Sequence, residues 1–537
     1  MSSGITVGFV ALPLAMAFAI ASGLKPDAGI FTAIIAGMII SGLGGSRVQI
    51  GGPAGAFIVI VYGIVQSYGV SGLIIASMMA GVMLFVMGVL KLGTLVRFVP
   101  ISIVIGFTNG IAVLIALSQI KDLFGLKIED LPSEFFPKIK SLFSHMGTLD
   151  PKTTMLALVS GIIVFGWPKF VSLTKMNFLK RIPGSIIALT SCTAAVTFLD
   201  LPVDTIGTRF GGIPSTLPSI TFPEFDLSTL RSLISPAATI AILGAIESLL
   251  CARVADGLID DRHDSNQELM AQGIANFVAP LFGGYAATGT IARTITNVRS
   301  GGKTPIAGMI HAVTLLMILL VAAPLAANVP LATLGAILLF VAYNMGEWHE
   351  FVRMLSFPRT YRLVLISTFI LTVVVDLTVA FEVGLLLASL IIITRLSQVT
   401  SLQPMSEVES LGIAKIGRDI EAYRISGSMF FGTVDKLDAL LEQITPQTKV
   451  IVLNVSALIN IDSSGLTALR QVRKKLADRG VKLLLSGAID QPLAVMKKAN
   501  FLKEMGKEIF DTNAEAFSYA AELRKQDKTQ VSDAVYA

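Results

Sequence analysis

Two ionisable side chains lie inside strongly apolar segments of this 537-residue chain. Arg293 is in GGYAATGTIARTITNV, and Glu247 is in PAATIAILGAIESLLCA. A charged residue inside a membrane-spanning segment costs about 2.5–3.5 kcal/mol on insertion scales, so both are candidates for a functional role. Arginine raises the positive potential along an anion path, and a buried carboxylate can be neutralised by a proton near neutral pH. Arg293 could instead snorkel or pair with Glu247, and these interpretations are compatible.

Two apolar segments, 47–65 and 283–298, are too short and too broken to cross a membrane alone. Each begins a helix after a glycine-rich, extended approach. A helix N-terminus carries about half a positive charge and free N–H groups, so two that face each other would attract a small anion.

The residue types of both approaches suit such an anion site. Pro53 fits the first turn of a helix, which does not use the missing N–H. Glycine lets a backbone approach a ligand closely, although these glycines could equally serve helix packing. The residues concerned are Gly51, Gly52 and Gly55 in the first segment, with Thr288, Gly289 and Thr290 in the equivalent approach of the second.

The composition places these segments in a membrane. Hydrophobic residues make up 53% of the chain and charged residues 15%, against about 25% charged in soluble domains. From Gly4 to about Leu396, apolar runs alternate with short breaks and give about fourteen membrane elements. The two broken segments occupy matching places in the two halves, which is typical of a transporter site built from inverted repeats. The net charge of +5 is too diluted to indicate a nucleic-acid partner.

Neither a metal site nor an enzyme active site is predicted. The two cysteines, Cys192 and Cys251, are both in apolar runs, and the four histidines are far apart in sequence. No nucleophile–base arrangement appears, so we expect no enzyme activity and no cofactor.

Loop charges predict the orientation. One short loop is basic, and a later loop, 200–231, is more acidic. The positive-inside rule places the basic loop in the cytoplasm and leaves both termini inside, in a plasma (inner) membrane. The basic residues are Lys169, Lys175, Lys180 and Arg181, and the later loop has Asp200, Asp204, Glu224 and Asp226 against Arg209 and Arg231.

After the membrane region the composition becomes that of a soluble protein. KVIVLNVS and VKLLLSG are typical of buried strands, and SSGLTALRQVRKKLADRG is typical of an amphipathic helix. Alternating strands and helices predict a small α/β domain. We therefore divide the chain into a membrane domain at 1–398, a linker at 399–412, the α/β domain at 413–525 and a tail at 526–537.

Several motifs together resemble a known family. They are ALPLAMAFAIASG, QIGGPAGAF, GAIESLL…ADG…RHDSNQEL and ATGTIARTITNVRSGGKTPIAG, in that order. These resemble the SulP anion transporters, also called solute carrier family twenty-six. The later VIVLNVSALINIDSSGLTAL resembles a STAS domain. The family usually has an amphipathic lead-in before the first span, whereas this chain starts almost at the span.

The resemblance implies a polytopic helical protein with two inverted seven-element repeats, a core and a gate domain, and a cytoplasmic STAS domain. Family members carry bicarbonate, chloride, sulfate or dicarboxylates, often as homodimers. Substrate is implied to bind at the two half-helix starts and against Phe18. The implied substrate residues are Phe18, Gly52, Pro53, Ala54, Gly55, Thr288, Gly289, Thr290, Ile291, Ala292 and Arg293.

Glu247 and Ser464 suggest how transport is coupled and regulated. Protonated Glu247 would relieve repulsion of the anion, which predicts proton-coupled symport by an elevator-like movement. Sodium coupling, known in relatives with Asp at the matching position, and an uncoupled channel or exchanger remain alternatives. In the STAS-like motif, Ser464 matches a serine that is phosphorylated in anti-sigma-factor antagonists, where a cytoplasmic regulator could bind. Helix capping explains Asp462, Ser463 and Ser464 equally well.

Overall fold

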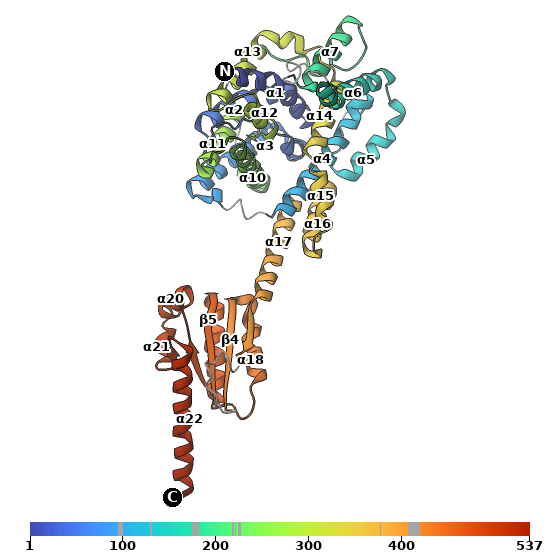
Figure 1. Ribbon diagram of the computed structural model, residues 1–537. Coiled ribbons are helices and arrows are strands. Elements are labelled where there is room, and N and C mark those ends of the chain that lie inside the picture. The colour runs from blue at the N-terminus through green and yellow to red at the C-terminus, as the bar shows by residue number, and fades with distance from the viewer. Residues whose placement is uncertain are drawn as a thin grey trace. The chain divides into compact units, whose positions relative to one another are not determined.

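The computed structural model describes residues 1–94, 100–128, 131–173, 182–216, 220, 222–223, 227–375, 377–405 and 419–536 (Figure 1). The chain divides into two compact units, Met1–Leu386 and Leu387–Ala537. In the described residues, nine helices are long and apolar enough to cross a membrane.

The first unit is mainly helical. Its first half contains α1 (Ser2–Ala21), α2 (Pro26–Leu43), α3 (Ile58–Val89), α4 (Ile101–Phe124), α5 (Phe135–Ser144), α6 (Pro151–Leu173), α7 (Gly184–Phe198), α8 (Ile206–Phe210) and α9 (Leu227–Ser232). Its second half contains α10 (Ile234–Ile259), α11 (Ser265–Val278), α12 (Ile291–Arg299), α13 (Ile306–Ala326), α14 (Leu331–Met345), α15 (Trp348–Met354) and α16 (Arg359–Val374), followed by α17 (Leu377–Val399).

Helix α3 is two helices joined at a break. Gly69 has φ +70° and ψ −178°, which interrupts the helical backbone and which glycine adopts without steric cost. With α3 counted as two, the described chain supplies seven apolar helices before residue 200 (α1, α2, both parts of α3, α4, α6 and α7). The later part also has seven if the short, polar α12 is included: α10, α11, α12, α13, α14, α16 and α17.

These helices pack in two groups. In the core group, α3 packs on α10 and α11, and α1 packs on α2 and α13. Small residues allow this close packing, since a Cβ on Gly81 of α3 would lie 2.7 Å from the carbonyl oxygen of Gly273 in α11. In the gate group, α4 packs on α14 and α16, and α6 packs on α7 and α14.

The second unit is built on a five-stranded sheet. Strand order is β3-β4-β5-β6-β7, with β3 antiparallel to β4 and the remaining neighbours parallel. Side chains of β5 alternate between the two faces, as the strand period requires. The strands are β3 (Ser401–Pro404), β4 (Ile420–Met429), β5 (Val450–Ile461), β6 (Lys482–Ser486) and β7 (Ile509–Phe510).

Helices cover both faces of this sheet. Ile451 and Leu453 pack with α18, α19, α20 and α21 on one face, whereas Val450 and Val452 pack with Phe517 of α22 on the other. The helices are α18 (Val434–Gln443), α19 (Ser463–Asp478), α20 (Asp490–Lys498), α21 (Phe501–Met505) and α22 (Asn513–Tyr536). The α/β architecture predicted from the sequence is therefore present.

Two boundaries differ from those expected. The expected linker, 399–412, contains β3, because Ser401–Pro404 pair in register with β4. The expected tail, 526–537, is mostly helical, because α22 continues to Tyr536. The residues 406–418 lie outside the described part, and so do Lys175, Lys180, Arg181, Glu224 and Asp226, on which the predicted orientation partly depends.

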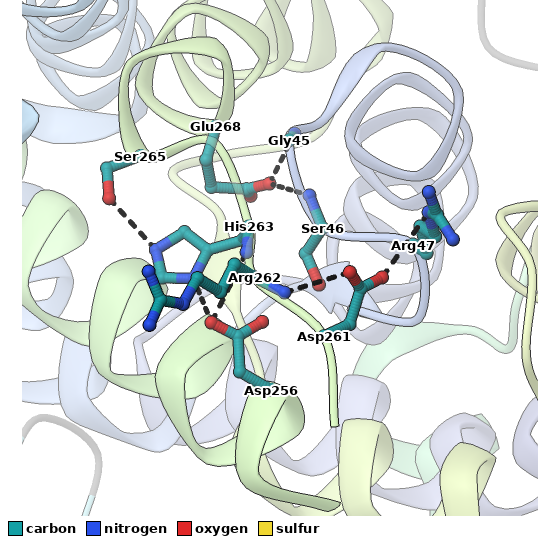
Figure 2. Close-up of polar contacts among 9 residues, drawn as sticks. All are labelled: Gly45, Ser46, Arg47, Asp256, Asp261, Arg262, His263, Ser265 and Glu268. Atoms are coloured by element: carbon teal, nitrogen blue, oxygen red, sulfur yellow. Dashed lines mark hydrogen bonds and ion pairs between the residues drawn. The ribbon is translucent and has the colours of Figure 1, made fainter. Parts of the chain in front are cut away.

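A buried acid ties the loop after α2 to the core group. Glu268 of α11 accepts hydrogen bonds from the backbone N–H groups of Gly45 and Ser46, at 3.0 and 3.3 Å (Figure 2). It also accepts from the Ser248 hydroxyl at 3.2 Å and the Gln272 amide at 3.0 Å. The side chain is fully buried, so these donors replace the water that the carboxylate has lost.

The loop after α2 also contacts the loop between α10 and α11. Arg47 forms an ion pair with Asp261 at 3.3 Å, and His263 Nδ1 lies 2.7 Å from Asp256 Oδ2 (Figure 2). Ser265 lies 3.0 Å from the other ring nitrogen of His263. The approach to the first broken segment is therefore fixed to the start of α11.

We predict that Glu268→Ala lowers the free energy of unfolding by about 3 kcal/mol, because four donors lose their shared buried acceptor. The apparent melting temperature of the full chain in detergent measures this change. Glu350→Ala is the matched control, because Glu350 pairs with Arg353 at the surface and should contribute little. Equal melting temperatures for the two variants would contradict the structural role of Glu268.

Candidate functional site

The two broken segments cross as a short antiparallel pair. β1 (Gly51–Gly52) pairs with β2 (Thr288–Gly289), with Gly51 opposite Gly289 and Gly52 opposite Thr288. Each strand leads within three residues into a helix, β1 into the short helix η1 (Gly55–Phe57) and α3, and β2 into α12. Because each strand leads directly into a helix, both helices begin at the crossing.

Further hydrogen bonds extend this pairing into α12. The backbone N–H and the hydroxyl of Thr290 both donate to the Ile50 carbonyl at 2.9 Å. The Ile50 N–H donates to the Thr294 hydroxyl at 3.0 Å, and Asn297 donates to the Val48 carbonyl at 2.9 Å. The backbone groups of Ile50 and the Val48 carbonyl are therefore satisfied by the second segment.

Helix α10 forms hydrogen bonds with both segments. The Thr288 hydroxyl donates to the Gly244 carbonyl of α10 at 3.0 Å. The Gln49 amide donates to the Ser248 hydroxyl, also of α10, at 2.8 Å. These contacts place β1 and β2 against the turn of α10 that contains Glu247.

Gly52 must be glycine for two reasons. Its φ of +154° lies in the region that L side chains rarely adopt. A Cβ at this position would also lie 2.5 Å from Nη1 of Arg293. The close approach expected for this glycine is therefore an approach of the backbone to Arg293.

Arg293 lies behind the crossing and not in an ion pair with Glu247. It is 1% exposed, and Nη2 donates to the Pro53 carbonyl at 3.4 Å. Nη1 is buried without a hydrogen-bond partner among the described residues. Within that part of the chain, no carboxylate lies at ion-pair distance from Arg293, so the alternative of an Arg293–Glu247 pair is not observed. Its charge therefore adds positive potential beside the two helix N-termini.

Phe18 faces the start of the first half-helix. A methyl group on Gly55 would lie 3.7 Å from Cε1 of Phe18 and 3.3 Å from the sulfur of Met345 in α14. Ala54 is buried at this point, whereas Ile291 and Ala292 in the first turn of α12 are exposed. The structure thus brings the expected substrate residues of three separate segments together at the boundary of the core and gate groups.

Glu247 occupies the adjacent turn of α10. Its side chain is partly exposed, but Oε2 is buried without a hydrogen-bond partner among the described residues. Its chain neighbour Ser248 bonds both Gln49 and Glu268. A carboxylate with one free, buried oxygen is suited to accept a proton.

Sequence reasoning missed two buried polar residues. Glu268 lies in the quoted motif RHDSNQEL but received no role, and only its polar partners identify it as a structural acid. His311 of α13 is 0% exposed, and neither ring nitrogen has a partner in the described structure. Its isolation in a long apolar run was the available signal.

The remaining predicted residues lie elsewhere. Asp462 caps α19 by accepting from the Gly465 N–H at 2.8 Å, and Ser464 lies in the first turn of that helix. Both cysteines are free and buried. Among the described residues, no group of three or more His, Cys, Asp or Glu side chains could hold a metal ion.

Family models match nearly the whole chain. The sulfate permease family matches residues 1–368, and the STAS domain matches residues 413–516. The putative sulfate transporter YvdB of Bacillus subtilis is 40% identical over 510 residues, which cover 95% of this chain and 94% of that one. The bicarbonate transporter BicA of Synechocystis sp. is 30% identical over 543 residues, covering 96% and 93%.

Two solved structures are similar to this chain in fold. SLC26A9 superimposes with a TM-score of 0.87 at 17% identity, covering 98% of this chain and 90% of that one, which shows the fold alone. The transmembrane domain of a cyanobacterial BicA superimposes with a TM-score of 0.63 at 30% identity, covering 72% and 96%. The predicted fold class and the absence of enzyme character in the family are confirmed. The chain belongs to the sulfate permease (SulP, SLC26) family of membrane anion transporters and carries a STAS domain at its carboxyl end.

Proposed function

We propose that this protein is a secondary active transporter that carries a small anion together with a proton. The pairing of β1 with β2 carries the proposal, because it directs two helix N-termini at one point. The helix dipoles and free N–H groups there supply positive potential without a fixed cage of cations, so an anion can bind and leave.

The buried Arg293 side chain adds to the positive potential at the crossing. Its guanidinium contacts the Pro53 carbonyl and has no carboxylate partner in the described structure. The substrate residues we propose are those of the crossing and its rim: Phe18, Gly52, Pro53, Ala54, Gly55, Thr288, Gly289, Thr290, Ile291, Ala292 and Arg293.

Glu247 is the proposed coupling residue. A permanent negative charge next to the site would repel the anion, whereas a protonated carboxyl group would not. The buried, unpartnered Oε2 supports this role. Sodium-coupled symport of bicarbonate, or uncoupled exchange or channel conduction, are the competing mechanisms.

The substrate belongs to the class of sulfate, bicarbonate, chloride and small dicarboxylates, because backbone dipoles recognise charge and size. Relatives described as sulfate and bicarbonate transporters support this class.

We further propose a homodimer in the plasma (inner) membrane, with both termini and the STAS domain in the cytoplasm. The core group would move past the gate group like an elevator, and a cytoplasmic regulator or phosphorylation at Ser464 would act through the STAS domain.

Uptake into proteoliposomes tests the function. Labelled sulfate, bicarbonate, chloride and fumarate are offered separately, with a proton or a sodium gradient imposed one at a time. Saturable uptake driven by the proton gradient supports the proposal. Uptake driven only by sodium, or non-saturating currents without either gradient, would replace it by one of the alternatives.

We predict that Glu247→Gln abolishes the dependence of uptake on the pH gradient, because the amide cannot bind and release a proton. Anion exchange without a gradient should persist. Glu382→Gln is the control, since Glu382 is an exposed acid in α17 and its replacement should leave coupling unchanged. Uptake by the Glu247→Gln protein that still follows the pH gradient would refute this role of Glu247.

We predict that Arg293→Gln raises the KM for the transported anion roughly tenfold, the effect of losing about 1.4 kcal/mol of binding. Arg299→Gln is the matched control, because it removes the same charge from an exposed position of the same helix. Initial uptake rates over a range of anion concentrations give the KM of each variant. Equal KM values for the two variants would remove Arg293 from the site.

A further inference from the structure

A cavity of about 310 Å³ separates the core group from the gate group beside the candidate anion site. Its core wall includes Ile20 at the end of α1 and Ile58 at the start of α3. Ile58 follows η1 directly, and Ile20 is two residues beyond Phe18. The cavity is therefore lined by residues that are close in sequence to those of the candidate site.

The gate wall of this cavity is basic. It contributes Lys121 from α4, Lys138 from α5 and Arg209 from α8, with Asp122 as the acid among the described lining residues. Asp122 and Arg209 form an ion pair at 2.7 Å, so these two charges offset each other. Glu129 and Asp130 of the same connection lie outside the described residues. The described wall therefore carries a net positive charge.

Lys138 is the buried cation of this cavity. Its side chain is only 5% exposed, and burying an ammonium group is costly unless a negative charge or hydrogen bonds compensate it. The Lys138 ammonium lies over the ring of Tyr62, 5.6 Å from its centroid, which compensates only in part. No described carboxylate forms an ion pair with Lys138. An anion in the cavity would supply the missing negative charge.

Other polar side chains also line the cavity, namely Gln66, Ser118, Gln119 and Ser133. The Ser118 hydroxyl already donates to the Ile115 carbonyl at 2.7 Å. The further donors are therefore the amides of Gln66 and Gln119 and the hydroxyl of Ser133. A water molecule occupies about 30 Å³ in the liquid, so the volume accommodates a small oxyanion with part of its hydration shell.

We propose that this cavity is a second anion site, in which Lys138 holds a small inorganic oxyanion between the solution and the β1–β2 crossing. The inference rests on the proposed transport function and adds a separate binding step to it. Tyr62 of α3 in the core group and Lys138 of α5 both line the cavity and contact each other across it through the cation–π pair. Movement of one group past the other would therefore open or close this site.

Lysine footprinting tests binding without requiring transport. The full chain in detergent is acetylated with acetic anhydride, with and without sodium sulfate or sodium bicarbonate at constant ionic strength, and modification is quantified by mass spectrometry. We expect either anion to slow acetylation of Lys138 severalfold. Lys140 is the internal control, because it is exposed on the same helix and should react equally under all conditions. No protection of Lys138 by either anion would overturn the proposal.

Transport kinetics provide the matched variants. Lys138→Gln should raise the KM for sulfate roughly tenfold with little change in the maximal rate, as expected for the loss of one charge-assisted contact. Lys138→Arg, which keeps the charge, and Lys140→Gln should both retain the original KM. An unchanged KM in Lys138→Gln would contradict a role in anion capture.

The charge of Lys138 also predicts a pH dependence. Burial lowers the pKa of Lys138 to about 8, so its ammonium is charged below that pH and neutral above it. The titratable and charged groups that share the cavity are Tyr62, Lys121, Asp122 and Arg209. Anion protection should therefore be present at pH 7 and lost as the pH rises through about 8. Sulfate is the probe because its own charge does not change in this range.

Two outcomes separate this inference from the proposed function. Protection of Lys138 by anions in a protein that transports none of them would support the second site and refute the transporter mechanism. Proton-driven uptake with an unprotected Lys138 and an unchanged KM in Lys138→Gln would support the transporter and refute the second site.

Discussion

Four residues pair through their backbones and connect the two broken segments of the membrane unit. Gly51 and Gly52 pair with Gly289 and Thr288, and the pair is only two residues long on each side. The hydrogen bonds of Thr290 and Thr294 to Ile50 extend it into α12. Without this pairing the two half-helices would have no common starting point, and the backbone groups of both approaches would lose their partners.

The electrostatics of the site depend on where the charges are placed relative to this pair. Arg293 is held by a backbone carbonyl and not by a carboxylate, so its positive charge is not cancelled locally. Glu268 is surrounded by donors and serves as an anchor. Glu247, only one residue from Ser248 in the same polar network, has a buried oxygen without a partner in the described chain. The two acids thus differ in how many hydrogen-bond donors surround them.

Much of this arrangement could be predicted from the sequence. Long apolar runs, the two glycine-rich breaks and the isolated charges are local signals, and each corresponds to a feature of the fold. The α/β architecture of the second unit followed from the alternation of strands and helices, and its STAS identity from the resemblance of one motif. The start of its sheet at Ser401 did not, because a four-residue edge strand has too little periodicity to be recognised.

The partners of the buried charges could not be predicted either. Glu268 bonds Gly45 and Ser46 across more than 200 residues of sequence, and a single sequence gives no indication of such a contact. The direction of the Arg293 side chain likewise depends on the space beneath Gly52, which only the tertiary structure defines. The partners of these buried charges are therefore known only from the tertiary structure.

If the anion binds at the crossing as we propose, recognition through main-chain dipoles has a consequence for selectivity. N–H groups at the start of a helix are the same whatever side chains surround them, so the crossing itself distinguishes little beyond charge and radius. Discrimination between anions of equal charge then falls to the bulky rim, where Phe18 and Met345 approach Gly55. Replacing these two side chains could alter the range of accepted anions while the cradle beneath them keeps its shape.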